Sequence, residues 1–281
     1  MGYHKSFVIF IDILGTRDRA SDFNEMYKIN TIFHEQMEQE QMMDDNHPYV
    51  VYERTVHTFS DCAYIIYDFK AGVEENRKNI FELMTIACYN TEKVCYRFLE
   101  EGFVFRGGMS YGDVYYEKER SLLFGPAINS AYELEAQKAN YPRIVVDPQI
   151  GEQLFSYIDE NVPKNVINGT ILKHDEDGFY YLHYLNNFEF GNSQDNDKEV
   201  TEIIYDLCER EIERAQDNEK LTEKQRTSII GKYKWLDKYI TDSQYKGFRD
   251  EEIDFDDEES MKRLEEYELE LVRSLAKGFF N

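Results

Sequence analysis

The chain has 281 residues, 42% of them hydrophobic, which is enough for one large domain or a domain with an extension. Its formal net charge is −24, from 56 acidic and 32 basic residues. Such a field repels nucleic-acid backbones and anionic membranes, so we expect neither as a partner. The four cysteines form no C-x-x-C pair, which leaves zinc and thiol redox motifs unsupported and favours a reducing, cytoplasmic location.

Hydrophobic periodicity predicts strands and helices in alternation through the first two thirds of the chain. Continuous β-branched and aromatic runs favour buried strands, whereas apolar residues at three- and four-residue spacing favour helices. The predicted elements are a strand at 5–14, a helix at 23–43, strands at 49–56 and 62–67 joined as a hairpin by 57–61, a helix at 76–101, a strand at 103–112, a helix at 125–140, a strand at 143–146, a helix at 149–158 and a hairpin of 171–172 with 179–184. This order predicts an α/β sandwich with helices over a largely antiparallel sheet.

The character of the sequence changes near residue 187. Residues 187–197 are polar and rich in Asn, as in a linker, and the periodicity beyond them is helical only. Thr222 and Gln225 have the spacing of a capping box, and the acidic run 250–259 is typical of a solvated loop before a last amphipathic helix. We therefore expect one domain over residues 1–187, which the motifs below mark as the catalytic one, and a helical C-terminal extension over 188–281.

Two aspartates occupy the positions expected of a metal site. Asp12 ends the first predicted strand, and Asp61 lies in the hairpin connection. Carboxylates at such strand ends can face each other across a cleft, where they repel unless a cation lies between them. Two divalent ions bridged in this way are the standard device for phosphoryl transfer. The plainer alternative is that each Asp only caps a turn or a following helix.

Four segments together resemble the motifs of class III adenylate and guanylate cyclases, in the family's order and spacing. Residues 10–15 (FIDILG) resemble the first metal-binding segment, and residues 59–64 (FSDCAY) the second, where Ser60 replaces the usual Gly. Residues 106–114 (RGGMSYGDV) resemble the strand Arg-x-Gly-x-x-x-Gly-x-Val. Residues 124–135 (FGPAINSAYELE) resemble the helix that opens Gly-x-x-Val-Asn-x-Ala-x-Arg-Leu-Glu.

The resemblance implies a ferredoxin-like βαββαβ core and specific site residues. Asp12 and Asp61, with Ile13, would hold two Mn²⁺ or Mg²⁺ ions in each active site. The backbone that follows would approach the substrate triphosphate: Leu14, Gly15 and Thr16. In this family the active site lies between two subunits, so a homodimer is implied. Asn129 would then orient the ribose of the substrate that the other chain's aspartates hold.

Three departures from the family pattern bear on the substrate. Glu133 stands where an Arg normally stabilises the transition-state phosphate, and His57 and Leu122 stand where a Lys and an Asp normally read the purine. Together with the segment 141–147 (YPRIVVD), this pattern resembles the pyrimidine cyclases of Pycsar anti-phage systems. The resemblance implies that UTP or CTP is converted to cyclic UMP or cyclic CMP, a messenger that activates a neighbouring effector.

Basic residues must replace the missing Arg, because phosphate charge needs compensation in an acidic protein. The candidates are Arg143, which we place with Asn129 as a catalytic residue, and Lys138 and Arg106 as substrate-binding residues. The expected base contacts come from the first hairpin: His57, Tyr52 and Arg54. Each of these residues also has a plain structural reading, as a surface ion pair or a packed hairpin residue.

Three other functions stay open at this point. One is a purely helical interaction role for residues 198–281, whose helices could dimerise, cover the site or sense infection. A purine cyclase with unusual base contacts would share the metal site. A catalytically inactive, cyclase-like nucleotide sensor is favoured by Glu133 and opposed by the retention of Asp12 and Asp61.

Overall fold

A computed structural model describes residues 2–16, 21–45, 50–117, 120–162, 171–186, 189 and 194–243. Its elements are β1 (His4–Ile13), α1 (Phe23–Asp45), β2 (Tyr52–Phe59), β3 (Cys62–Phe69), the 3₁₀ helix η2 (Glu75–Arg77), α2 (Ile80–Glu100), β4 (Phe105–Glu117), β5 (Leu122–Phe124), α3 (Pro126–Lys138), β6 (Ile144–Val146), α4 (Pro148–Asn161), β7 (Leu172–His174), β8 (Tyr180–Leu182), α6 (Gln194–Asp217) and α7 (Glu223–Asp242). The predicted acidic run and last helix lie outside the described residues. No helix among those described is long and apolar enough to cross a membrane.

One sheet organises the fold, with the strand order β2-β3-β1-β4-β6-β8-β7 and β5 paired to β4. β1 is antiparallel to both of its neighbours, β3 and β4, whereas β4 and β6 run parallel. The first four strands alternate with α1 and α2 in the ferredoxin-like βαββαβ pattern, in which each helix carries the chain across to a non-adjacent strand. The predicted α/β class and its largely antiparallel sheet are confirmed.

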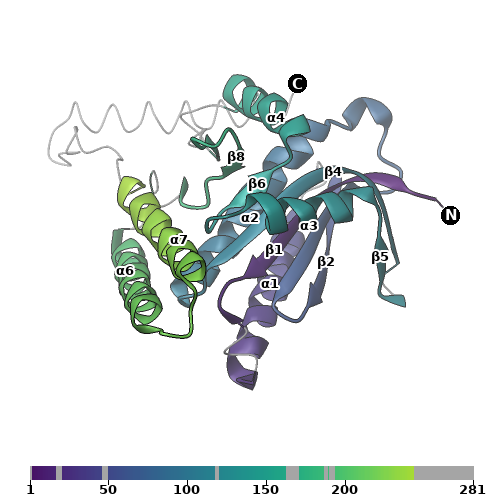
Figure 1. Cartoon of the computed structure of the whole chain (residues 1–281). Coiled ribbons are helices and arrows are strands. Elements are labelled where there is room, and N and C mark those ends of the chain that lie inside the picture. The colour runs from purple at the N-terminus through teal and green to yellow at the C-terminus, as the bar shows by residue number, and fades with distance from the viewer. Residues whose placement is uncertain are drawn as a thin grey trace, which may run out of the picture.

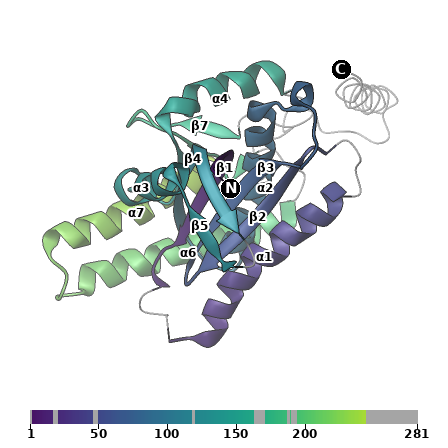
Figure 2. The ribbon, with the colours of Figure 1, turned by 90° about the vertical axis from the view of Figure 1, so that its right-hand side faces the viewer.

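The two faces of the sheet carry different helices. Along β1, Phe7, Ile9 and Ile11 belong to the large core under α1 and α2, and the alternate residues Val8 and Phe10 pack in a smaller cluster with α3. This is the period-two alternation of a strand that is covered on both faces. Figure 2 shows the strands between α3 on one side and α1 and α2 on the other, and Figure 1 shows α3 in front of the sheet.

Glycines on β4 let α3 lie unusually close to the sheet. A Cβ atom built on Gly108 would lie 2.2 Å from the carbonyl oxygen of Ala131 and 2.7 Å from the Cβ of Leu134. On Gly112 it would lie 3.4 Å from the Cβ of Ala127. Because these two glycines carry no side chain, the helix runs directly over β4 and ends beside the last residues of β1.

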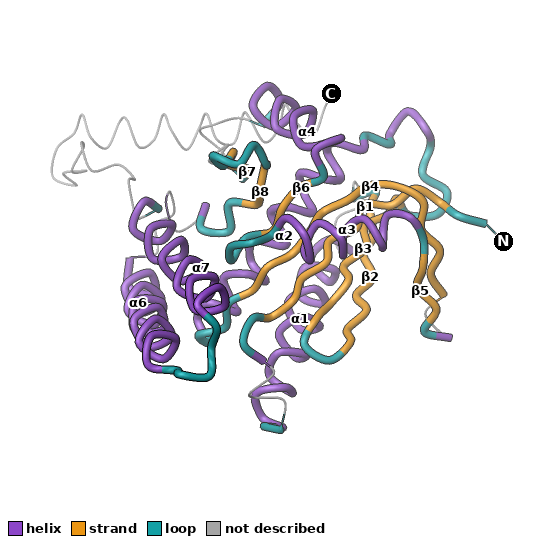
Figure 3. Tube along the Cα trace, in the orientation of Figure 1, coloured by secondary structure: helices purple, strands orange, loops and turns teal. Residues whose placement is uncertain are grey.

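The helices α6 and α7 form an antiparallel pair at the end of the sheet (Figure 3). The predicted capping box of α7 is confirmed, with Thr222 and Gln225 bonded to each other's backbone N–H. Leu207 of α6 and Leu236 of α7 belong to the same buried cluster as β1 and α2. The helical pair therefore shares the core of the sheet, and the boundary at residue 188 stays a prediction.

The first hairpin is tighter than the sequence predicted. β2 continues to Phe59, and the turn consists of Ser60 and Asp61 alone, so that His57 lies within a strand and pairs with Tyr64. Cross-strand pairing of 57–59 with 62–64 extends the ladder to the turn. β4 likewise runs beyond the predicted 112 to Glu117, where it pairs with the unpredicted β5.

Candidate active site

The ends of β1 and of the first hairpin meet at one edge of the sheet. Asp12, the second-last residue of β1, lies between Cys62 of β3 and Arg106 of β4 in the strand register. The backbone N–H of Ile13 donates to the carbonyl oxygen of Asp61 at 3.0 Å. Two residues that are far apart in sequence are thereby fixed side by side, as the metal-site hypothesis requires.

The loop after β1 closes around the Asp61 carboxylate. Thr16 is buried, and its hydroxyl donates to Asp61 Oδ2 and lies 3.4 Å from the carbonyl oxygen of Ile13. The N–H of Leu14 bonds to the Val104 carbonyl at 2.7 Å, and Gly15 turns the chain with a φ of +79°. Asp61 Oδ2 and the carbonyl oxygen of Ile13 therefore both face the Thr16 hydroxyl.

The helix α1 holds the hairpin turn from the opposite side. Asn30 donates from Nδ2 to the carbonyl oxygen of Ser60 at 2.9 Å, and His34 Nε2 lies 3.2 Å from Thr58 Oγ1. Ser60 itself has a φ of +57°, in the left-handed region that glycine adopts most easily. This conformation accounts for the glycine that the resembled motif usually has at this position.

Arg106 links the Asp12 carboxylate to α3. Its Nε lies 2.5 Å from Glu135 Oε1 and 3.7 Å from Asp12 Oδ2. Burial, the Glu135 charge and, to a smaller extent, the Asp61 charge raise the pKa of Asp12 from 3.8 to about 6, against the opposing charge of Arg106. Burial is the largest cause, the neighbouring carboxylates add to it, and a bound cation would offset both by favouring the ionised form.

Cys62 lies beside the two aspartates but is no candidate nucleophile. Its Sγ bonds to the carbonyl oxygen of Phe59 at 3.0 Å. Burial, followed by the charges of Asp12, Asp61 and Glu135, raises the pKa of the thiol to about 12. The thiol therefore stays protonated near neutral pH, whereas nucleophilic cysteines need the thiolate.

The donor set fits a divalent cation that keeps other ligands. Within the described ranges, no group of three or more His, Cys, Asp or Glu side chains is arranged to hold a metal. The oxygens available here are the carboxylates of Asp12 and Asp61 and the carbonyl of Ile13, which shares the Thr16 hydroxyl with Asp61. Mg²⁺ and similar hard cations are commonly held by one or two carboxylates, with substrate phosphates and water completing the shell. The residues present therefore fit a divalent cation, and the pair of ions expected from the sequence stays a prediction.

Asn129, Lys138 and Arg143 do not contact this aspartate pair. Asn129 is exposed on α3, and the Lys138 ammonium lies 5.9 Å from the centre of the Phe179 ring. Arg143 is fully buried and forms ion pairs with Asp175 and Asp177 in the turn before β8. These ion pairs explain the burial of Arg143 by a structural role, and its predicted catalytic role stays a prediction.

The hairpin residues predicted to contact the base separate into two groups. His57 lies on the α3 face of the sheet, where its ring centre is 6.1 Å from that of Tyr116. Tyr52 begins β2, at the far end of the hairpin from Asp61, and its hydroxyl donates to the carboxylate of Asp44 of α1 at 3.2 Å. Arg54 pairs with Asp44 as well, with a side chain that is 2% exposed. The structure therefore places His57, and not Tyr52 or Arg54, on the face that carries Asp12.

Two charged residues of the site were missed by the sequence analysis. Glu135 lies within the helix motif, and its pairing with Arg106 follows once α3 is known to run along β4. Lys232 of α7 is half-buried, and the Arg106, Glu135 and Asp12 charges all act on it. No sequence signal points to Lys232, because its place depends on how a distant helix docks.

Comparison of the chain with protein-family models and with curated proteins finds no match. Among solved structures, the monomeric guanylyl cyclase domain of the RhoGC fusion protein from the aquatic fungus Blastocladiella emersonii is 18% identical with a TM-score of 0.40, over 65% of this chain and 96% of that one. The catalytic core of a rhodopsin-guanylyl cyclase with converted specificity, in complex with ATPαS, is 16% identical with a TM-score of 0.40, over 65% and 97%. A bacterial light-regulated adenylyl cyclase is 14% identical with a TM-score of 0.41, over 73% and 57%. Similarity this low assigns no activity, which has to be argued from the site.

Proposed function

We propose that this chain is a nucleotidyl cyclase that converts a ribonucleoside triphosphate into a 3′,5′-cyclic nucleotide and pyrophosphate. One observation carries the proposal: the ends of β1 and of the first hairpin bring Asp12 and Asp61 together, beside a loop that has open space at Gly15. A Cβ built on Gly15 would meet no atom within 4 Å, so the loop offers unobstructed space. Both aspartate motifs that resemble class III cyclases lie at this edge of the sheet, the strand motif begins there with Arg106, and the helix motif reaches it at Glu135.

In the proposed reaction, the 3′-oxygen of the ribose attacks the α-phosphorus. A new P–O bond forms, the bond to the bridging oxygen breaks, pyrophosphate leaves with that electron pair, and the hydroxyl proton passes to solvent. Asp12, Asp61 and the Ile13 carbonyl would hold two Mn²⁺ or Mg²⁺ ions, which when bound supply acidity at the 3′-hydroxyl and neutralise phosphate charge. Thr16 orients the Asp61 carboxylate, and Arg106 holds Asp12 and Glu135 in place.

The proposed substrate is a pyrimidine nucleotide, UTP or CTP. The support is the absence of both expected purine-reading side chains, since His57 and Leu122 occupy those positions. His57 lies on the sheet face that carries Asp12, three residues before the hairpin turn, and Leu122 is 38% exposed in β5. The solved cyclases named above are guanylyl and adenylyl enzymes, so a purine substrate is the competing proposal, and the assay below includes it.

The proposed assembly is a homodimer with composite sites. Asn129 is exposed and lies about four helical residues, or roughly 6 Å, before the level of Glu133 on α3. Its exposure leaves it accessible to the ribose of a nucleotide held by the other subunit. An exposed Glu133 fits this arrangement poorly, because it would bring a negative charge to the same phosphate, and it is the observation that favours the inactive-sensor alternative.

The direct test is to incubate the full chain with each of the four ribonucleoside triphosphates and Mn²⁺ or Mg²⁺, and to separate the products by mass spectrometry. We expect cyclic UMP or cyclic CMP from the wild type and no product from Asp12→Asn or Asp61→Asn. Asp206→Asn, an exposed change on α6, is the matched control and should keep full activity. Cyclic purine products would replace the pyrimidine proposal, and the lack of any cyclic product would refute the cyclase proposal.

A further inference from the structure

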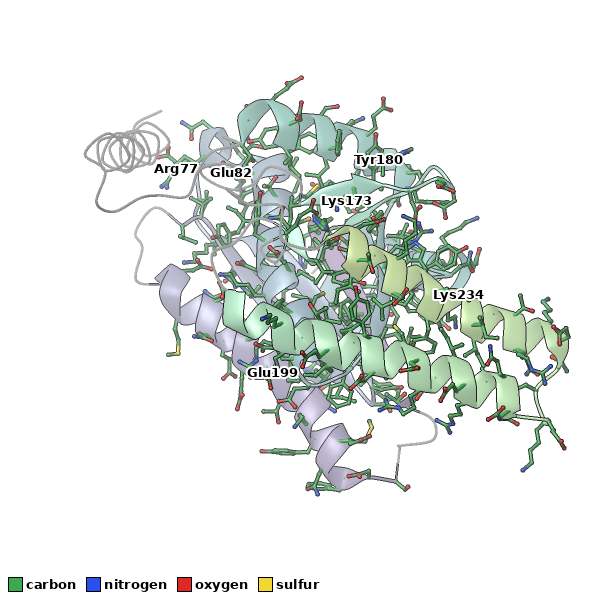
Figure 4. The ribbon with its side chains drawn as sticks, turned by 90° about the vertical axis from the view of Figure 1, so that its left-hand side faces the viewer. Arg77, Glu82, Lys173, Tyr180, Glu199 and Lys234 are labelled. Atoms are coloured by element: carbon green, nitrogen blue, oxygen red, sulfur yellow. The ribbon has the colours of Figure 1, made fainter. Side chains whose placement is uncertain are left out.

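The helical pair and the end of the sheet enclose a cavity beside the aspartate site. Its volume is about 250 Å³. The sheet side is lined by Leu14 and Gly15, the residues proposed to approach the triphosphate, and the helical side includes Lys232 of α7 and Arg214 of α6. Figure 4 shows the two helices across this end of the molecule, and Figure 1 shows the turn between them on the side where β1 ends.

Lys232 is a basic group of this cavity that also reaches the charges of the site. Its side chain is half-buried, and burial together with the Arg106 charge lowers its pKa, whereas the charges of Glu135 and Asp12 act in the opposite direction. Within the described part of the chain, no carboxylate lies in ion-pair distance of its ammonium. Glu135 is already paired with Arg106 at 2.5 Å, so Lys232 is not needed to neutralise it.

Among the charged groups near Asp12, one basic side chain is available to bind a phosphate. Three carboxylates, Asp12, Asp61 and Glu135, face two basic groups, Arg106 and Lys232. Arg106 is held by carboxylates on two sides. In the cavity itself, Arg214 is already paired with Glu211 at 3.7 Å, and both residues line it. Among the described lining residues, Lys232 is therefore the basic group whose ammonium is not engaged by a carboxylate. A half-buried ammonium binds phosphate oxygens more strongly than an exposed one, because little water competes for it.

Aromatic packing fixes the position of α7. Trp235 stacks on Tyr141 with ring centres 5.7 Å apart and planes 6° from parallel. The hydroxyl of Tyr239 lies 2.7 Å from Nδ1 of the fully buried His183 and accepts from the Leu185 N–H at 3.3 Å. The ammonium of Lys232 is thus carried by a rigid element and not by a mobile surface helix.

We infer that Lys232 is a substrate-binding residue, which contacts the phosphate chain of the nucleotide and retains the pyrophosphate product in the cavity between α7 and the loop after β1. The inference deepens the proposed function and rests on it. It assigns to the C-terminal helical pair a part of the active site, and it supplies from α7 a positive charge that α3 lacks at Glu133.

Binding of inorganic pyrophosphate to the full chain tests the inference without turnover. In titration calorimetry with Mg²⁺ present, Lys232→Met should weaken binding about tenfold to a hundredfold, the loss expected for one charge-assisted contact. Lys232→Arg should bind within about threefold of wild type. Lys234→Met, an exposed change two residues along α7 (Figure 4), should bind as wild type does.

The outcomes separate the two proposals. If wild type cyclises a nucleotide but Lys232→Met, folded by circular dichroism, binds pyrophosphate with unchanged affinity, the inference is wrong and the cyclase proposal stands. If no nucleotide is cyclised but pyrophosphate binding depends on Lys232, the cyclase proposal fails and the cavity is a polyphosphate site. Failure of the wild type to bind pyrophosphate, or equal weakening by Lys234→Met, would also overturn the inference.

Discussion

Replacing Asp12 by Asn should stabilise the cation-free protein near neutral pH while removing the proposed cyclase activity. The pKa of Asp12 is raised from 3.8 to about 6 in the folded state, so folding holds the carboxyl proton more tightly. Because the pKa of Asp12 is raised in the folded state, its proton contributes to the free energy of unfolding. This contribution is fully present below about pH 4 and is lost as the pH rises through 6. The shift corresponds to roughly 3 kcal/mol at most. Because the side chain is 27% exposed, solvent screening reduces this, and we expect about 1–3 kcal/mol.

Urea unfolding in the presence of a chelator measures the difference. At about pH 7.5 the Asp12→Asn variant should be the more stable protein, and at about pH 5 the gap should shrink to about half, since the folded carboxylate is then mostly protonated. Mn²⁺ should raise the stability of the wild type and leave the variant unchanged. A variant that is less stable than the wild type at about pH 7.5, or a gap that does not change with pH, would refute the electrostatic reasoning.

Four further substitutions test the fold by urea unfolding. Gly108→Ala should destabilise the folded protein by about 1–3 kcal/mol, because the new Cβ would collide with the Ala131 carbonyl. Gly231→Ala lies within α7, where a Cβ meets open space, and should stabilise it by about 0.5–1 kcal/mol. Equal effects of the two substitutions would contradict the close approach of α3 to the sheet. Ser60→Gly should stabilise by about 1 kcal/mol by relieving a left-handed φ, and a loss of stability would show that the Ser60 side chain matters more. Tyr239→Phe should cost about 1–3 kcal/mol by leaving His183 and a buried N–H without this hydroxyl, and an unchanged midpoint would exclude that anchor.

The fold was predictable to the extent that its signals are local. The continuous apolar run before Asp12 and the helical spacing of 76–101 specify β1 and α2 closely, because burial on a strand or helix face leaves a period in the sequence. The short strand β5 and the extension of β4 to Glu117 carry no such period. They depend on pairing with a neighbouring strand, which single-sequence patterns do not reveal.

The candidate site shows the same division. The approach of Asp12 and Asp61 could be anticipated because both lie at strand ends that a hairpin and a crossover bring to one edge. Tyr52 and Arg143 were assigned from residue type alone, and their positions are decided by Asp44 of α1 and by two acidic residues before β8. Whether a basic or phenolic side chain is available to a ligand depends on partners many residues away in the sequence. Residue type alone does not reveal those partners.

The spacing of Lys232 and Tyr239 along α7 ties the direction of the Lys232 side chain to that of Tyr239. Seven residues are nearly two helical turns, so both side chains leave the helix in almost the same direction, toward the body of the molecule. Inserting one residue between them would turn the ammonium by about 100° and move it by about 1.5 Å along the axis, while the phenol stayed seated on His183. Length changes in this stretch of the chain should therefore be tolerated far less than substitutions on its outer side.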